Sequence, residues 1–249
     1  MSESNVIEEV TASFEQCKSE LLERGWTILS PALLRDGPRP ALAHFGRIVP
    51  QLNGEETYEV TLKPGFDKLP YSQSKNEIGP HTEAPVYDPP PRYLALHCHR
   101  QAKCGGGQTM LADGFAFYQS LSPELKQWVR QNEVEFSSSA VPGVSGQSLH
   151  RARLLEQKDG ARVFRFSYNQ FHYGDVNPSE KDMASSSFER YAGTALGDIA
   201  RLAERFFYEN VIPVLIPEGS ILIWDNQRLM HARSEFKDPV RHLTRYWLG

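Results

Sequence analysis

Two residues in the first half of the chain have the types and the spacing of metal ligands. His81 and Glu83 are two positions apart, so in an extended chain both side chains point to the same face and can reach one ion. Taken alone, this His-x-Glu pattern is a weak signal, because a chance surface pair looks the same. The best candidate for a further imidazole ligand is His231. Two histidines and one carboxylate on one face of an octahedral ion leave the opposite positions open, which is typical of non-haem Fe(II) oxygenases.

Two arginines that follow His231 are candidates for binding an anion. Arg241 lies ten residues beyond His231, and Arg245 lies four residues further along the same predicted strand. Residues at even separation share a face of a strand, so both guanidinium groups are expected to point where His231 points. A guanidinium pairs with a carboxylate through two parallel hydrogen bonds, and 2-oxoglutarate has a distal carboxylate that must be anchored. Pairing with structural acids such as Asp225 or Glu218 is the alternative interpretation.

The elements that must position these residues are mostly short strands. Several short strands with a few covering helices favour a mainly β fold with a double-stranded β-helix core, also called a jelly roll or cupin-like core, over the strand-helix alternation of a Rossmann fold. Because no linker, repeat or low-complexity tract is present, residues 1–249 are expected to form a single domain. Strands are predicted at residues 26–29, 92–98, 162–168, 211–216, 220–224 and 243–248, and helices at residues 10–22, from residue 122, and from residue 177 or slightly later towards residue 210.

The composition is that of a globular protein, with 249 residues of which 40% are hydrophobic. The formal net charge of -4 provides no overall basic field to attract nucleic acid or anionic lipid. No apolar run approaches the roughly 20 residues of a membrane helix, and the polar N-terminus lacks the features of a signal peptide, so a cytoplasmic location is expected. The three cysteines, Cys17, Cys98 and Cys104, fit neither a disulfide framework nor a zinc pattern and are expected to be reduced thiols.

Taken in order along the chain, these motifs resemble those of the taurine dioxygenase/clavaminate synthase-like superfamily of Fe(II)- and 2-oxoglutarate-dependent oxygenases. The resemblance runs from about Tyr71 to the C-terminus, whereas the first 70 residues match only in general style. The short chain is also similar to the compact bacterial branch that includes free amino-acid hydroxylases and halogenases. The motifs are HTE at 81–83, PPRYLALHC at 90–98, GGGQTMLADG at 105–114, WDNQRLMHAR at 224–233 and RHLTR at 241–245.

The resemblance implies roles for individual residues. His81, Glu83 and His231 would be the iron ligands, Arg241 would hold the distal carboxylate of 2-oxoglutarate, and Thr109 would assist with its hydroxyl. Many relatives carry aspartate where this chain has Glu83, and glutamate is the clavaminate-synthase variant, so the metal site is expected to be intact. Relatives that chlorinate have a small residue at this position, so the carboxylate of Glu83 favours hydroxylation over halogenation.

The resemblance also implies a reaction. With Fe(II), 2-oxoglutarate and O₂, the enzyme would hydroxylate an unactivated C–H bond of a small carboxylate-bearing substrate, an amino acid or a derivative, and release succinate and CO₂. Arg245 would suit a carboxylate or sulfonate of the substrate. Loops at the mouth of the barrel are expected to supply the other contacts. Two segments are candidates, residues 72–76 and residues 168–172, although either could instead be a capping loop. The candidate residues in these loops are Ser74, Asn76, Tyr168, Asn169 and His172.

Two other interpretations stay open. The same cofactors would also serve desaturation, cyclisation or another oxidation, and the sequence does not separate these outcomes. A non-catalytic cupin-like domain with a structural metal ion is the alternative of another class, but such a site needs no anion anchor like Arg241. His97 and His99 share the two-residue spacing but have no carboxylate two positions away, so they are expected to pack on one face of a strand. A small molecule is the only partner expected, and the sequence predicts no oligomeric state.

Overall fold

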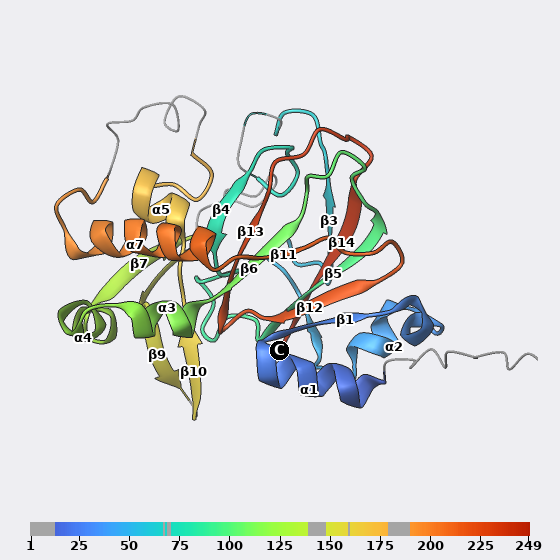
Figure 1. Cartoon of the computed structure of the whole chain (residues 1–249), viewed down its shortest axis with the longest axis horizontal. Helices are drawn as coiled ribbons and strands as arrows, with labels where there is room; N and C mark the ends of the chain where they lie inside the picture. The colour runs from blue at the N-terminus through green and yellow to red at the C-terminus, as the bar shows by residue number, and fades with distance from the viewer. Residues whose placement is uncertain (1–12, 67, 69–70, 139–147, 159, 179–189) are drawn as a thin grey trace, which may run out of the picture.

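Two antiparallel sheets lie face to face at the centre of the computed structural model, which describes residues 13–66, 68, 71–138, 148–158, 160–178 and 190–249 (Figure 1). Within these residues, the larger sheet has the strand order β1-β12-β5-β14-β2, with β3 also paired to β14. The smaller sheet has the order β11-β6-β13-β4. Strands β7 and β8 pair with each other, as do β9 and β10. The arrangement is mainly antiparallel β with covering helices, as the sequence predicts.

The bounds of the elements show that most strands are short. The strands are β1 (Trp26–Leu29), β2 (Ile48–Val49), β3 (Thr57–Thr61), β4 (Ile78–His81), β5 (Tyr93–Arg100), β6 (Thr109–Asp113), β7 (Glu133–Ser137), β8 (Leu149–Arg153), β9 (Leu155–Lys158), β10 (Ala161–Phe164), β11 (Ile212–Val214), β12 (Ile221–Asp225), β13 (Leu229–Arg233) and β14 (His242–Leu248). The helices are α1 (Phe14–Arg24), the 3-10 helix η1 (Pro31–Leu34), α2 (Pro38–Leu42), α3 (Gly114–Ser120), α4 (Pro123–Gln131), α5 (Tyr168–Tyr173) and α7 (Ala195–Glu209).

Buried side chains hold the layers together in three groups. One group fills the space between the two sheets. A second packs the outer face of the larger sheet against α1 and α2, and a third packs the smaller sheet against α3, α4, α5 and α7. Strand β5 shows the alternation behind this layering: Leu94, Leu96 and Cys98 belong to the group between the sheets, whereas Ala95 belongs to the outer group. The site described below also lies between the two sheets.

Local chemistry sets several boundaries where the sequence predicts them. Gly25 ends α1 in the left-handed conformation, with φ of +84°, and the chain enters β1 at the next residue. Ser122 caps α4, because its hydroxyl accepts a hydrogen bond from the backbone N–H of Leu125, and Pro123 occupies the first helical position. Within α1, Cys17 and Leu21 are buried, whereas Leu22 is 75% exposed.

Three predictions about secondary structure are wrong. The helix predicted from Asn177 is not continuous, because residues 190–194 form turns and α7 begins at Ala195. Thr194 caps α7 by accepting a hydrogen bond from the N–H of Gly197, and part of the predicted helix, residues 179–189, lies outside the described residues. The strand predicted at 162–168 ends at Phe164. Strand β13, which carries His231, is absent from the predicted strands.

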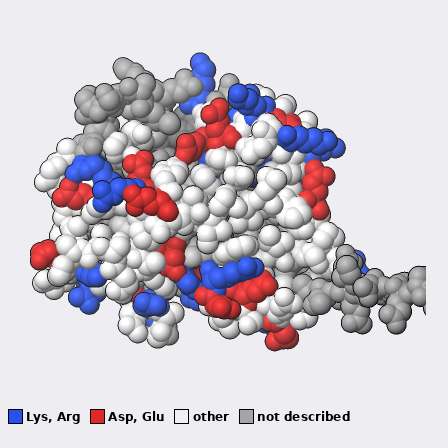
Figure 2. Space-filling model, in the orientation of Figure 1, with Lys and Arg blue, Asp and Glu red and all other residues white. Residues whose placement is uncertain are grey.

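The charged side chains of the surface are mixed in sign. Lysine and arginine lie among aspartate and glutamate around the margin of the face seen in Figure 2. Among the described residues, no helix has the length and apolar character needed to cross a membrane.

A row of histidines lies on the face of the larger sheet that points away from the smaller one. His97 and His99 of β5 pack together as predicted, with ring centroids 4.4 Å apart, and the His99 ring is 4.7 Å from that of His242 in β14. Thr244 lies between His99 and Glu59, and Glu59 also contacts His242. Burial and the neighbouring imidazoles lower the pKa of both His97 and His99.

The histidine row predicts a loss of stability in acid. A histidine with a lowered pKa in the folded state takes up its proton first in the unfolded chain, so its contribution is complete above its ordinary pKa of 6.5 and declines as the pH falls below that value. We expect the urea concentration at the unfolding midpoint to decrease when the pH is lowered from 7.5 to 5.5. The urea midpoint of the His97→Asn/His99→Asn double variant should decrease less over the same pH interval. An equal decrease in wild type and in the double variant would contradict the prediction.

Candidate active site

His81 and His231 face each other across two paired strands. His81 is the last residue of β4, and its Cα is the partner of the Cα of His231 in β13. Thr82 turns the other way, where its N–H donates to the carbonyl oxygen of Phe166 over 2.9 Å and its hydroxyl accepts from the N–H of Phe166 over 3.0 Å. This alternation returns the side chain of Glu83 to the side of the two histidines.

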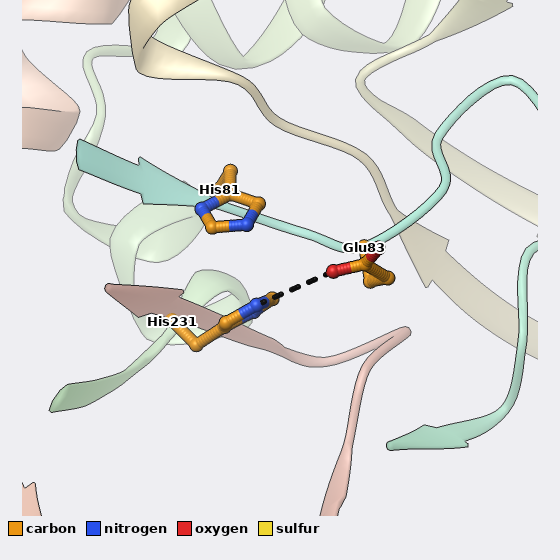
Figure 3. Close-up of side chains that lie close together, drawn as sticks. All are labelled: His81, Glu83 and His231. Atoms are coloured by element: carbon orange, nitrogen blue, oxygen red, sulfur yellow. Dashed lines mark ion pairs between the residues drawn. The ribbon is translucent and has the colours of Figure 1, made fainter. Parts of the chain in front are cut away.

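The three side chains point toward one another (Figure 3). His81, Glu83 and His231 each offer one ligand atom, and these atoms lie within 4.8 Å of one another. The imidazole centroids are 4.1 Å apart, and Nε2 of His231 lies 3.8 Å from Oε2 of Glu83. No other group of three or more histidine, cysteine or acidic residues in the described part of the chain meets this distance. Two imidazoles and a carboxylate form a donor set that fits a divalent iron ion.

Burial favours the neutral form of both imidazoles. It lowers the pKa of His231 well below its ordinary value, and the charges of His81 and Arg245 lower it further. Burial also lowers the pKa of His81. Nδ1 of His81 lies 2.9 Å from the carbonyl oxygen of Gly79, an interaction that assigns the proton to Nδ1 and leaves the lone pair of Nε2 free. Neutral imidazole is the form that binds metal ions.

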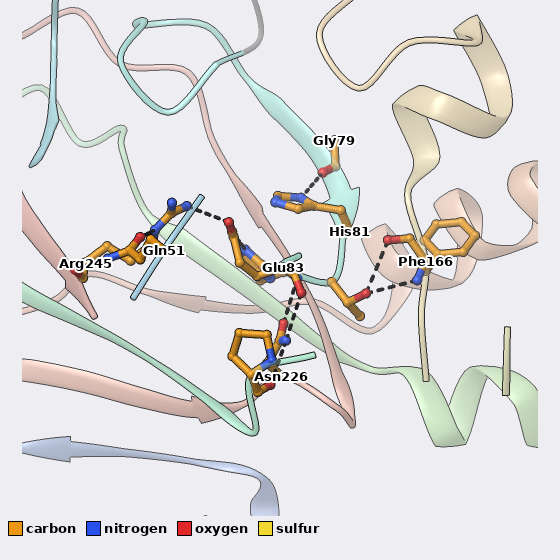
Figure 4. A network of polar contacts seen from close by, with 10 residues as sticks. Gln51, Gly79, His81, Glu83, Phe166, Asn226 and Arg245 are labelled. Atoms are coloured by element: carbon orange, nitrogen blue, oxygen red, sulfur yellow. Dashed lines mark hydrogen bonds and ion pairs between the residues drawn. The ribbon is translucent and has the colours of Figure 1, made fainter. Parts of the chain in front are cut away.

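Glu83 is held through both its backbone and its side chain (Figure 4). Its N–H donates to Oδ1 of Asn226 over 2.7 Å, and its carbonyl oxygen accepts from Nδ2 of Asn226 over 3.0 Å. Nη1 of Arg245 donates to Oε1 of Glu83 over 2.8 Å, and Nε of Arg245 donates to Gln51 over 2.9 Å. One carboxylate oxygen is therefore bound by the arginine, while the other faces His231.

Asn226 is fully buried, and replacing it with alanine is expected to weaken metal binding about 10- to 100-fold, as found for residues that support metal ligands. The variant would lose both hydrogen bonds to the backbone of Glu83. Cobalt(II) titration followed by absorbance measures the effect. Gln227→Ala is the matched control, because Gln227 is a buried amide that bonds to Pro90 and Arg92 instead. Equal affinity in the Asn226→Ala and Gln227→Ala variants would contradict the prediction.

A second feature of the site is a positively charged cavity beside the three ligands. Thr109, His231 and Arg241 line it. Arg241 is 2% exposed, its buried Nε has no hydrogen-bond partner, and it forms no ion pair within the described residues. Burial lowers the pKa of Arg241 only to about 10, so the group is charged at pH 7. A buried cation without an anion is costly, and an anionic ligand would remove that cost.

Arg241 reaches this cavity from just outside the strand. Strand β14 begins at His242, with an irregular register between His242 and Leu243, so the prediction that Arg241 and Arg245 share a regular strand is wrong although both line the cavity. The glycine turn packs on the arginine: Gly107 has φ of +73°, and a Cβ there would lie 2.9 Å from Cδ of Arg241. Only glycine fits this position without displacing the guanidinium.

Arg233 is a residue of this cavity to which the sequence motif assigns no role. It is 5% exposed and lies two residues after His231 in β13. Its guanidinium donates to the carbonyl oxygen of Ser72 over 2.9 Å, and it also contacts Tyr71, Ser74 and Asn76. Burial and the charge of Arg241 lower its pKa to about 9. The even spacing from His231 is the sequence signal that places it on the same face.

A larger, open cavity is also lined by Glu83, and only some of the predicted substrate-binding residues line it. Asn169 and Arg245 do. Ser74 is fully buried within its own loop, Asn76 does not line the cavity, and Tyr168 and His172 stack on each other in α5 with ring centroids 5.1 Å apart. The sequence gives no signal for the other lining residues, which come from separate segments and include Gln51, Tyr58, Tyr71, Ser72, Ser137 and Ser138.

The comparison with protein families decides the classification. The family described as taurine catabolism dioxygenase TauD, TfdA family matches residues 11–247. This chain belongs to the TauD/TfdA family. The match confirms the predicted superfamily and extends the resemblance well before Tyr71, into the region that includes α1 and β1.

Individual relatives of the TauD/TfdA chain are distant. A curated relative, 3-((Z)-2-isocyanoethenyl)-1H-indole synthase of Fischerella ambigua (strain UTEX 1903), is 24% identical over 170 residues, which are 66% of this chain and 60% of the relative. The matched part therefore spans less than two thirds of that protein.

Solved structures show the fold. An asparagine oxygenase in complex with Fe(II), 2S,3S-3-hydroxyasparagine and succinate matches with a TM-score of 0.69 at 15% identity, covering 94% of this chain and 78% of that one. The non-heme iron oxygenase OrfP in complex with Fe and alpha-ketoglutaric acid matches with a TM-score of 0.61 at 16% identity, covering 93% and 77%. These likenesses confirm the predicted mainly β, jelly-roll fold class.

Proposed function

We propose that this chain is an Fe(II)- and 2-oxoglutarate-dependent dioxygenase that hydroxylates an unactivated C–H bond of a small carboxylate-bearing substrate, an amino acid or a derivative. One observation carries the proposal: a two-histidine, one-carboxylate donor set shares a cavity with Arg241, a buried cation that has no anion among the described residues. A structural metal site would need the first feature but not the second. Membership of the TauD/TfdA family supports the same activity.

In this proposal His81, Glu83 and His231 hold the iron, Arg241 binds the distal carboxylate of 2-oxoglutarate, and Thr109 donates its hydroxyl to the same group. Bound iron and 2-oxoglutarate supply the activation of O₂, with succinate and CO₂ as products. The chain contributes the rest. Burial favours the neutral form of the imidazoles, Arg245 fixes one carboxylate oxygen of Glu83, and the anion site and the metal site lie in one cavity.

Arg245 is the proposed anchor for the acidic group of the substrate. It lines both cavities. Its Nη1 and Nε are occupied by Glu83 and Gln51, while Nη2 has no hydrogen bond to any described residue. Two of the solved structures with the same fold contain hydroxylated amino acids, 2S,3S-3-hydroxyasparagine and (3S)-hydroxy-L-Arg, which supports a small amino-acid-like substrate here.

Succinate release tests the proposal. Protein loaded with Fe(II) and 2-oxoglutarate would be screened in air against amino acids, peptides and sulfonates, and a substrate should raise succinate release above the uncoupled rate. Arg245→Gln should raise the KM of that substrate about 10-fold or more, the loss expected for a charge-assisted hydrogen bond. Failure of the whole panel with continued uncoupled turnover would exclude the tested substrate classes. Absence of any 2-oxoglutarate consumption would contradict the proposed dioxygenase activity.

Desaturation is a second candidate outcome, because the product named for the Fischerella ambigua relative contains an ethenyl group. The site would be the same, and the mass of the product separates the two reactions, since hydroxylation adds one oxygen atom whereas desaturation removes two hydrogen atoms. Four other expectations stay predictions. They are the preference for hydroxylation over halogenation, the single domain over residues 1–249, the absence of nucleic-acid or membrane partners, and the cytoplasmic location.

A further inference from the structure

Two buried guanidinium groups lie on the same aromatic ring in the smaller, charged cavity. The guanidinium carbon of Arg233 is 5.1 Å from the ring centroid of Phe236, and that of Arg241 is 5.3 Å from it. Both arginines line the cavity, and neither forms an ion pair with a described residue. Two neighbouring buried cations repel each other, so a negatively charged group bound at this end of the cavity would reduce that repulsion.

The fully buried Arg165 provides a comparison within the same chain. It forms ion pairs with Asp88 and Glu156, as expected for a buried arginine with a structural role. Arg233 is almost equally buried, but its partners are neutral oxygens. Its positive charge is therefore not compensated within the described part of the fold.

The partners of Arg233 lie in a single loop. Its Nη1 donates to the carbonyl oxygen of Ser72, and its Nη2 lies within hydrogen-bond distance of oxygens of Tyr71, Ser74 and Asn76. Ser72 lines both the charged cavity and the open cavity, and Tyr71 lines the open one. The start of the loop at residues 71–76 therefore contributes to the walls of both cavities, and Arg233 holds this loop.

We propose that Arg233 is a positioning residue that couples the charged cavity, the proposed site of 2-oxoglutarate, to the open cavity, the proposed site of the substrate. It does so by adding a second positive charge beside Arg241 and by holding the loop at residues 71–76. The inference rests on the proposed function. Without the co-substrate, repulsion from Arg241 opposes the bonds between Arg233 and the loop. A bound dianion reduces that repulsion, so the loop is held more firmly and the substrate cavity gains a defined wall.

Binding measurements without oxygen test the charge. Iron(II)-loaded wild type, Arg233→Lys and Arg233→Met would be titrated with 2-oxoglutarate and with pyruvate, a 2-oxo acid that lacks the distal carboxylate. We expect Arg233→Met to weaken 2-oxoglutarate binding about 10- to 100-fold, the effect of losing one favourable buried charge, and to change pyruvate binding less than about 3-fold. Arg233→Lys should recover part of the loss. Arg165→Lys, the matched buried control, should keep the wild-type ratio between the two ligands.

Hydrogen–deuterium exchange tests the coupling. In wild type, 2-oxoglutarate should slow amide exchange in peptides that cover residues 71–77, and in Arg233→Met it should not do so at saturating ligand. Equal losses for 2-oxoglutarate and pyruvate in Arg233→Met would indicate a merely structural role and overturn the inference, as would unchanged 2-oxoglutarate affinity. Wild-type protein that binds no 2-oxoglutarate would instead overturn the proposed function on which the inference rests.

Discussion

Replacing His231 with alanine is expected to abolish 2-oxoglutarate turnover and to weaken iron binding by more than about 100-fold, beyond the 10- to 100-fold typical of residues that only support a ligand. The substitution removes one of three donors, and no other histidine, cysteine or acidic residue in the described part of the chain joins this group. Iron retained after dialysis and succinate release measure the two effects. His81→Ala should behave in the same way.

The control for this prediction is His99→Ala. His99 lies in the histidine row on the opposite face of the larger sheet, beside His242 and Thr244, and its loss should leave iron content and turnover within about 2-fold of wild type, since it touches neither cavity. A His231→Ala variant that retains iron and turns over 2-oxoglutarate at the wild-type rate would remove His231 from the proposed ligand set.

Replacing Arg241 with methionine is expected to raise the KM for 2-oxoglutarate about 100- to 4,000-fold, corresponding to the roughly 3–5 kcal/mol lost when one partner of a buried ion pair is removed. The value of kcat at saturating 2-oxoglutarate should change much less, because the iron ligands are untouched. Arg241→Lys should show an intermediate KM, since lysine keeps the charge but loses the planar fork.

The stability of the ligand-free protein gives an independent check on Arg241. Wild type contains this buried cation without an anion among the described residues, so Arg241→Met should not lower the melting temperature of ligand-free protein. Addition of 2-oxoglutarate with Fe(II) should raise the melting temperature of wild type more than that of the variant. A ligand-free variant that is much less stable than wild type would indicate that Arg241 has a structural partner outside the described residues.

The proposed metal ligands are predictable to the extent that their signal is local. The spacing of His81 and Glu83 predicts that both side chains face the same way, and Thr82, which turns to Phe166, separates them in the structure. His231 is far away in sequence. It is the best candidate for a further imidazole, and the resemblance gives it the same role, but the pairing of β4 with β13 that brings it to His81 is a tertiary event. The prediction of strands missed β13, so the sequence offered no account of how the residues meet.

Residues that support the site were harder to predict. Asn226 lies inside a motif that the sequence shows, but its bonds to the backbone of Glu83 join residues that are 143 positions apart. The lining of the open cavity comes from separate segments, and Ser74 and Tyr168 of the predicted contacts point elsewhere.

The most direct test of the central proposal is the absorption spectrum of the protein with Fe(II) and 2-oxoglutarate in the absence of oxygen. If the three ligands and Arg241 form one site, wild type will show a weak visible charge-transfer band when both are present. The band will be absent in His231→Ala, and in Arg241→Met it will require much higher concentrations of 2-oxoglutarate. A colourless wild-type mixture, or a band unchanged in both variants, would contradict the proposal.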